Sequence, residues 1–128
     1  MQLVLDPYRF DVLVMENMFG DILSDLMVGL IGGLGFAPAG NIGPDAAMFE
    51  AVHGSAPDIA GQGIANPTGL LLSACLMLDH IDQPDVATRI RGAIDHVIQI
   101  GESRTVDMGG SSSTREFTAP LVRALAGG

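Results

Sequence analysis

The feature that most constrains the fold is an imbalance between long apolar helix patterns and very few strand-like runs. Only two short stretches have strand character, residues 10–15 (FDVLVM) and 47–52, and they alternate with several helical segments. Strands that alternate with helices predict an α/β layered fold. Two short strands do not make a sheet that stands alone, and the helices are more apolar than a small domain needs. The sequence therefore predicts part of a larger α/β architecture.

The first long helix is predicted from Asn17, as its N-cap, to about Ile31, where Gly32 and Gly33 end it. Its apolar residues cover more than one stripe, so burial on two sides is expected. Residues 1–5 indicate the tail of a helix or strand. The segment from Pro38 to Pro44 is predicted as loop.

The second half is predicted to be helical. Asn66 and Pro67 resemble a cap and a first-turn proline for an almost wholly apolar helix ending near residue 78. Pro84 opens an amphipathic helix that Gly101 ends. Ser113-x-x-Glu116 is a capping box for a last helix, in which Pro120 predicts a kink or a later start. We expect one domain over residues 1–128.

Composition excludes several classes of function. Fifteen acidic residues against six basic ones, all arginine, give a net charge of −9. This charge argues against nucleic acid or an anionic membrane as partner. Apolar runs are shorter than the ~18–20 residues that span a bilayer. Cys75 is the only cysteine and lies in an apolar helical pattern, which indicates a buried structural thiol.

Asp21 and Asp25 are four residues apart and therefore share one helical face. A pair of carboxylates suits a hard divalent ion such as Mg²⁺ or Mn²⁺. The alternative is that both acids lie in the solvated first turn, where they favour the helix dipole.

The loop after Glu50 carries a second pattern, with His53, Gly54 and Ser55 followed by Asp58 and Gly61. Glycine permits close backbone approach, and a carboxylate suits the free hydroxyls of a ribose while repelling a 2′-phosphate. The alternative is an ordinary turn with a locally bonded Asp and His.

Taken together, these segments resemble the isocitrate/isopropylmalate dehydrogenase family over nearly the whole chain. The resemblance is carried by Asn17-x-x-Gly20-Asp21-Ile-x-Ser24-Asp25, Gly32-Gly33-Leu-Gly35 with Pro38 and Asn41-Ile-Gly43, Glu50-x-x-His53-Gly-Ser-Ala-Pro-Asp58-Ile-Ala-Gly61, Ala65-Asn66-Pro67 and Thr105-x-Asp107-x-Gly109-Gly110. It implies the three-layer mixed-sheet α/β fold of that family, different from the Rossmann fold, of which this chain is the C-terminal part.

The resemblance implies a β-decarboxylating dehydrogenase that uses NAD or NADP with Mg²⁺ or Mn²⁺. Asp21 and Asp25 resemble two metal ligands on a helix over 17–31, which packs at a dimer interface. A cofactor loop over 50–67 precedes a helical part over 67–128. The residues that resemble the family's cofactor-binding positions, where Asp58 favours NAD, are His53, Gly54, Ser55, Ala56, Pro57, Asp58, Ile59 and Asn66.

The family's catalytic Tyr and Lys, a third metal-binding Asp and the substrate arginines are expected upstream of Met1. We therefore predict no catalytic residue and no turnover in these 128 residues alone. The glycine-rich segment 32–41 resembles isocitrate and homoisocitrate enzymes more than isopropylmalate ones. This resemblance implies isocitrate as the first expected substrate, with homoisocitrate or 3-isopropylmalate as alternatives. A non-catalytic regulatory subunit or an inactive interaction fragment is the alternative of another class. The expected partners are a small 2-hydroxy acid and further subunits in a homodimer or higher oligomer. The expected location is the cytoplasm, or the mitochondrial matrix in a eukaryote.

Overall fold

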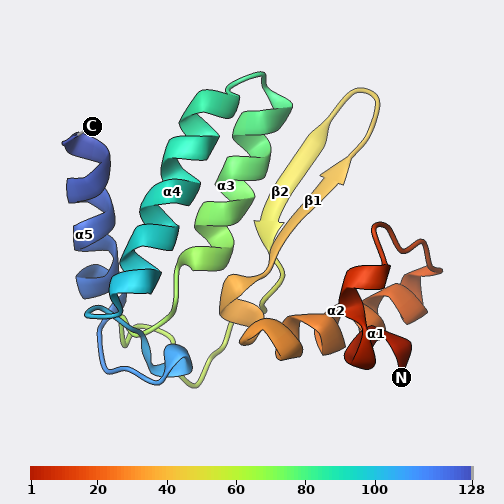
Figure 1. Ribbon diagram of the computed structural model, residues 1–128, viewed down its shortest axis with the longest axis horizontal. Helices are drawn as coiled ribbons and strands as arrows, with labels where there is room; N and C mark the ends of the chain where they lie inside the picture. The colour runs from red at the N-terminus through yellow and green to blue at the C-terminus, as the bar shows by residue number, and fades with distance from the viewer. Residues whose placement is uncertain (128) are drawn as a thin grey trace.

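The computed structural model describes residues 1–127 and consists of helices with one small hairpin (Figure 1). The elements in chain order are α1 (Gln2–Leu5), the 3₁₀ turn η1 (Pro7–Arg9), α2 (Asn17–Ile31), η2 (Leu34–Phe36), β1 (Pro38–Ile42), β2 (Ala47–Ala51), α3 (Thr68–His80), α4 (Pro84–Ile100), η3 (Val106–Met108) and α5 (Thr114–Ala126). The hairpin, α3, α4 and α5 stand side by side, whereas α2 leads away from them toward α1 and the N-terminus.

The hydrophobic core lies between α3, α4 and α5. Phe117 on α5 is fully buried against the apolar stripe of α4. That stripe recurs at helical spacing, so one face of α4 is apolar and the other charged. Cys75 on α3 is also buried, as predicted, and burial raises the pKa of its thiol. The members of the cluster are Ala93, Ile94, Val97, Phe117 and Leu121.

The hairpin corrects the prediction of a loop from Pro38 to Pro44. Residues 38–42 form β1, which pairs antiparallel with β2 in a register that places Gly40 opposite Phe49. Gly43 donates its N–H to the carbonyl of Ala46 at 2.9 Å and closes the turn. The sequence of β1 has poor strand propensity, but the hydrogen bonds supplied by β2 outweigh it. The predicted strand over 47–52 is confirmed as Ala47–Ala51.

Residues 10–15 do not form the strand that their β-rich sequence predicts. A strand needs a neighbour to satisfy its backbone groups, and β1 and β2 pair with each other. Among residues 1–127, no segment pairs with 10–15, so the apolar side chains there stay exposed; Val12 is 80% and Val14 92% exposed.

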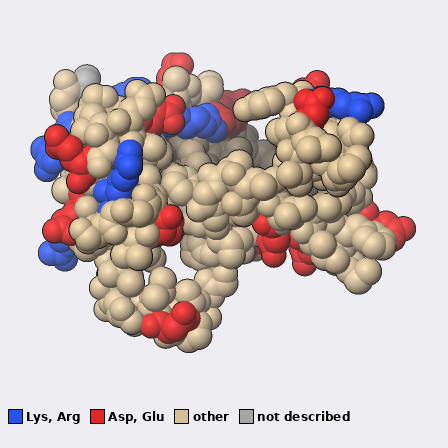
Figure 2. Space-filling view, turned by 60° about the horizontal axis from the view of Figure 1, so that its bottom comes forward, with Lys and Arg blue, Asp and Glu red and all other residues tan. Residues whose placement is uncertain are grey.

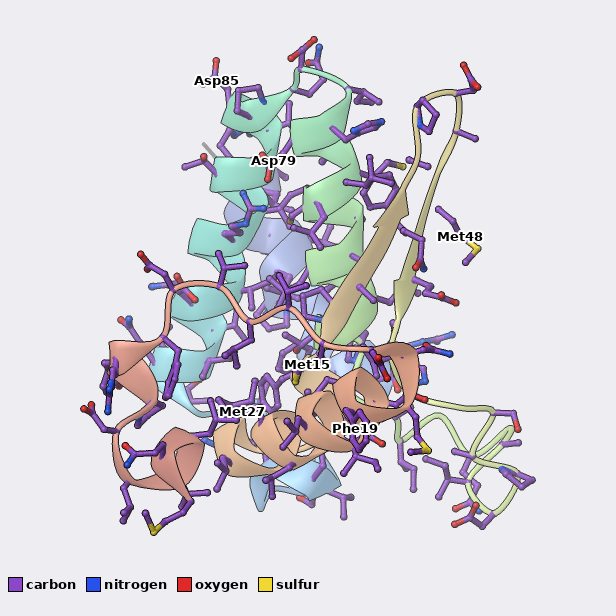
Figure 3. All side chains as sticks on the ribbon, turned by 90° about the vertical axis from the view of Figure 1, so that its right-hand side faces the viewer. Met15, Phe19, Met27, Met48, Asp79 and Asp85 are labelled. Carbon is purple, nitrogen blue, oxygen red and sulfur yellow. The ribbon has the colours of Figure 1, made fainter. Side chains whose placement is uncertain are left out.

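Helix α2 has the predicted length but neither the predicted cap nor the predicted burial. Its N-cap is Glu16 rather than Asn17, and no side chain caps it. All its residues are exposed or half-buried because its main contacts are with the short elements α1 and η2. Its apolar side chains, Phe19 and Met27 among them, are seen in Figure 3. Two-sided burial of this helix is therefore wrong for the chain as described.

The ends of the other helices mostly follow the predicted signals. Gly101 ends α4 in the left-handed region at φ 72°, and Pro84 lies in its first turn. The capping box of Ser113 and Glu116 is confirmed. Helix α5 begins at Thr114 and continues through Pro120, so the later start is wrong. Helix α3 begins at Thr68, with Pro67 as its N-cap rather than its first residue. No helix in the described chain is long and apolar enough to cross a bilayer.

Candidate functional site

The segment between β2 and α3 folds as a chain of tight turns on the surface. Ile59 donates its N–H to the carbonyl of Ala56, and Gln62 donates in turn to that of Ile59, each at 3.1 Å. The side-chain amide of Gln62 also donates to the Asp58 carbonyl at 2.7 Å. Ala56 has a positive φ of 42°, which is uncommon for a residue with a side chain. These local bonds hold the predicted cofactor loop as a defined structure.

This loop forms one wall of a cavity of about 870 Å³. Leu34 and Gly35 of η2 and Asp107 of η3 also line it. Six of the eight predicted cofactor residues line the cavity: His53, Gly54, Ser55, Ala56, Ile59 and Asn66. Most of the lining residues are glycine, alanine or aliphatic, so the backbone is open to a ligand. The structure thus brings together in one cavity residues that the sequence spreads over more than seventy positions.

Pro57 and Asp58 belong to the same loop but are not among the lining residues. Asp58 is exposed, between Ala56 and Ile59, which do line the cavity. Its carboxylate therefore lies in solvent beside the cavity rather than in its wall.

Asn66 is the most buried polar residue of the loop, with 7% of its surface exposed. Its side-chain oxygen Oδ1 accepts two hydrogen bonds from Thr68, from the backbone N–H at 3.0 Å and from the hydroxyl at 2.6 Å. Its Nδ2 donates to Oδ2 of Asp107 at 2.9 Å. The other carboxylate oxygen of Asp107 accepts from the hydroxyl of Thr105, which is fully buried. This network joins the loop to η3, forty-one residues further along the chain.

Leu34, Gly35 and Asp107 line the cavity but were not predicted as site residues. A Cβ on Gly35 would lie 2.6 Å from Oδ2 of Asp107, so this position needs a glycine for the close approach of η2 to Asp107. A signal for both positions exists in the sequence, because Gly35 belongs to the glycine run and Asp107 to the Thr105-x-Asp107-x-Gly109-Gly110 motif. Gly35 and Asp107 are far from the loop in the sequence, so the sequence alone did not predict that they line the same cavity.

Asp21 and Asp25 lie on α2 as the i,i+4 pair that the sequence predicts, and both are exposed. The hydroxyl of Ser24 between them donates to the Asp21 carbonyl at 3.1 Å. Across the described residues, no group of three or more His, Cys, Asp or Glu side chains is placed to hold a metal ion. Two carboxylates on one helical face are a partial donor set. Such a set suits Mg²⁺, which is commonly held by one or two carboxylates and completed by water and substrate oxygens.

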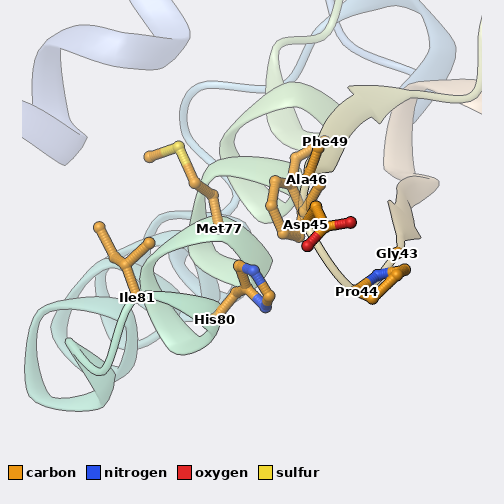
Figure 4. Close-up of a pocket in the computed structure, with 9 residues that line it drawn as sticks. Gly43, Pro44, Asp45, Ala46, Phe49, Met77, His80 and Ile81 are labelled. Atoms are coloured by element: carbon orange, nitrogen blue, oxygen red, sulfur yellow. The ribbon is translucent and has the colours of Figure 1, made fainter.

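A second cavity, of about 520 Å³, lies between the hairpin turn and the end of α3 (Figure 4). Its titratable residues are Asp45 and His80, and the His80 ring lies 5.5 Å from the ring of Phe49. None of the predicted site residues lines it. Six of the predicted cofactor residues line the larger cavity, and the predicted metal pair Asp21 and Asp25 lines neither cavity.

Charge is distributed unevenly over the surface. In Figure 2, the basic side chains gather mainly at the α4–α5 end, while acidic ones are spread across the face shown. Five of the six arginines follow residue 88, and the sixth is Arg9.

The chain is similar in sequence and fold to dehydrogenases of known structure. The family model described as isocitrate/isopropylmalate dehydrogenase matches residues 1–121. The chain belongs to the isocitrate/isopropylmalate dehydrogenase family. The crystal structure of isocitrate dehydrogenase from Methylococcus capsulatus superposes with a TM-score of 0.92 at 54% identity, over 97% of this chain and 37% of that one. The chain therefore has the fold of this family, with mixed helices and strands, as predicted.

Three curated relatives have similar sequences. The isocitrate/homoisocitrate dehydrogenase of Thermus thermophilus is 58% identical over 98% of this chain and 37% of its own length. The probable mitochondrial NAD isocitrate dehydrogenase subunit alpha of Caenorhabditis elegans is 56% identical over 94% and 34%. The 3-isopropylmalate dehydrogenase of Archaeoglobus fulgidus is 54% identical over 98% and 38%. The chain spans 34–38% of the length of these relatives.

Proposed function

We propose that this chain supplies cofactor- and metal-binding parts of an NAD-dependent oxidative decarboxylase. The substrate class is a 2-hydroxy acid with a 3-carboxylate, and isocitrate, converted to 2-oxoglutarate and CO₂, is our first choice. The observation that carries the proposal is the cavity of about 870 Å³, in which six of the eight residues predicted from sequence come together.

The cavity is suited to the adenosine half of a dinucleotide. Gly54 and Gly61 have open space where a side chain would begin, so a flat base can approach the backbone there. Asn66 offers a buried amide in the same wall. Asp58, exposed beside the cavity, is placed to favour the free ribose hydroxyls of NAD and to repel the 2′-phosphate of NADP. Pro57 fixes the backbone just before Asp58.

The metal-binding part is the exposed pair Asp21 and Asp25 on α2. A bound Mg²⁺ or Mn²⁺ supplies Lewis-acid stabilisation of the charge that develops on substrate oxygens during decarboxylation. The role of these two side chains is to hold that ion and to leave its remaining positions open for water and substrate. We propose that α2 also faces a second subunit, because its apolar side chains are exposed in the described chain.

These assignments divide the single domain into three parts. They are a metal-site helix over 17–31, a cofactor loop over 50–67 and a helical part over 67–128. Homoisocitrate and 3-isopropylmalate are the alternative substrates, because similar relatives are named for them. A regulatory subunit without turnover is the alternative of another class. The presence of both Asp21 and Asp25 favours a catalytic origin, since a subunit that binds no metal has no need of the pair.

The test is a calorimetric titration of the chain with NAD and, separately, with NADP. We expect NAD to bind at least about tenfold more tightly, a difference of about 1.4 kcal/mol. The Asp58→Asn variant should lose most of this preference while binding NAD itself. Equal binding of the two dinucleotides by the unaltered chain would contradict the role of Asp58, and binding of neither would contradict the proposal as a whole.

A parallel titration with Mn²⁺ tests the metal site. Asp21→Asn and Asp25→Asn should each weaken Mn²⁺ binding, whereas Asp45→Asn at the hairpin turn is a control that should leave it unchanged. Incubation of the chain with isocitrate, NAD and Mn²⁺ should form no NADH, because the chain contains no lysine and a single tyrosine for acid–base chemistry. NADH formation above background would show that this last expectation is wrong.

A further inference from the structure

We infer that Asp107 is a positioning residue that, together with Thr68, fixes the amide of Asn66 so that its N–H, rather than its oxygen, is offered to the cavity. The inference rests on the proposed function, because it assigns the cavity to a dinucleotide. It concerns two residues forty-one positions apart whose side chains meet at the cavity wall.

The orientation of the Asn66 amide follows from its partners. An asparagine side chain has an acceptor oxygen and a donor nitrogen, and it can be turned either way unless its neighbours choose. In this structure the orientation is determined, because Thr68 presents two donors, its backbone N–H and its hydroxyl, to one end of the amide. Only Oδ1 can accept from them, so Nδ2 must lie at the other end.

Asp107 completes this arrangement at the nitrogen end of the amide. An ionised carboxylate only accepts hydrogen bonds, so it can face Nδ2 but not Oδ1. Its Oδ2 takes one proton of Nδ2 at 2.9 Å, and its Oδ1 is held by the buried hydroxyl of Thr105. Both carboxylate oxygens therefore have partners within the protein, which fits a residue that orients another.

The second proton of Nδ2 has no acceptor among the hydrogen bonds of the described residues, although Asn66 is nearly buried. A buried donor without a partner is destabilising, so a ligand that offers an acceptor should bind favourably to this N–H. The N–H is already oriented, so no further ordering of the side chain is needed. A purine ring nitrogen with a free lone pair is such an acceptor. The network thus prepares a single donor for the base and excludes the reversed amide.

Two single variants of Asp107 and one double variant distinguish orientation of the Asn66 amide from direct contact of Asp107 with the ligand and from a loss of stability. Asp107→Ala removes the acceptor, so NAD should bind about tenfold more weakly, as expected for one lost hydrogen bond to an oriented group. Asp107→Asn keeps a carbonyl oxygen for Nδ2, while the hydroxyl of Thr105 can turn to accept. Its Kd for NAD should stay within about threefold of the unaltered chain.

The double variant Asn66→Asp, Asp107→Asn reverses the hydrogen bond between the two residues. Asp at 66 still accepts from Thr68 and now accepts from Asn at 107, so every bond of the network can form. The melting temperature should therefore stay close to that of the unaltered chain. The donor to the cavity is gone, and NAD binding should be at least about tenfold weaker.

The experiment measures NAD binding by calorimetry and folding by thermal melting for the complete chain and each variant. NAD binding by the double variant equal to that of the unaltered chain would overturn the inference. So would equal losses in Asp107→Ala and Asp107→Asn, which would mean that the carboxylate itself contacts the ligand. If Asp107→Ala does not fold, the other two variants still decide. Failure of the unaltered chain to bind NAD would instead overturn the proposed function, and with it the inference.

Discussion

The α3–α5 half of this chain and helix α2 differ in how far their apolar side chains are buried. In the α3–α5 half, apolar stripes face one another, and Phe117 is fully buried among them. In α2, a helix of similar length, Phe19 is 53% exposed and the apolar residues have no comparable cover. The amino acids are of the same kind, so the difference lies in what each helix packs against. Residues in the α3–α5 half should therefore determine stability, and those on α2 should not.

The largest expected effect comes from Phe117→Ala. Removing a buried phenylalanine leaves a cavity in the core and should lower the free energy of unfolding by about 3–5 kcal/mol. The matched control is Phe19→Ala on α2, which should change it by less than about 0.5 kcal/mol as a surface substitution. Chemical denaturation monitored by circular dichroism compares them. Similar losses in both variants would mean that α2 is as well packed as α5.

A smaller effect is expected at the cavity from Gly35→Ala. The new Cβ would lie 2.6 Å from Oδ2 of Asp107 and 3.0 Å from Cβ of Asn66, so η2 must move away from these two side chains. We expect a loss of about 1–3 kcal/mol, the usual cost of overpacking, together with weaker NAD binding. Gly54→Ala in the same cavity is the control for stability alone, because nothing in the protein lies within 4 Å of its added Cβ. Equal stability of the two variants would show that η2 and η3 are not in close contact.

The helix ends give a third contrast. Ser113 caps α5 through its side chain, whereas Glu16 at the start of α2 makes no such bond. Ser113→Ala should cost about 1 kcal/mol of unfolding free energy, and Glu16→Ala should be nearly neutral. A loss in Glu16→Ala as large as that in Ser113→Ala would contradict the account of these ends.

The smallest effect is a pH dependence at the same cap. Hydrogen bonds from the backbone N–H and the hydroxyl of Ser113 lower the pKa of Glu116. A carboxyl with a lowered pKa in the folded state stabilises that state above its ordinary pKa, and this contribution disappears as the pH falls through the lowered value. The unaltered chain should therefore melt at a higher temperature than Glu116→Gln at pH 7. This difference in melting temperature should shrink as the pH is lowered toward 3. A constant difference between them across this range would contradict the sign.

Sequence reasoning succeeded where a signal is local. The capping box at Ser113 and the Gly101 end of α4 each depend on residues within a turn of one another. It failed where pairing or cover comes from elsewhere. Residues 38–42 form a strand because β2 pairs with them. Residues 10–15 form no strand because none of the described segments pairs with them.

The candidate site shows the same division. The loop residues from His53 to Ile59 and Asn66 were predicted because they belong to two short motifs that resemble those of the family. Asp107 belongs to a motif seen in the sequence but was missed as a site residue, because its contact with Asn66 joins positions forty-one residues apart. The metal pair on α2 was predicted from helical spacing, and its function as a pair stays a prediction.

The most direct test of the central claim is an NMR titration of the ¹⁵N-labelled chain with NAD. If the larger cavity holds the adenosine half, the amide signals of Gly54, Ser55 and Gly61 and the side-chain amide of Asn66 should shift together and saturate with one Kd. The signals of Ala46 and His80, at the cavity beside the hairpin turn, should stay unchanged. Shifts confined to the hairpin cavity, or none at saturating NAD, would contradict the account.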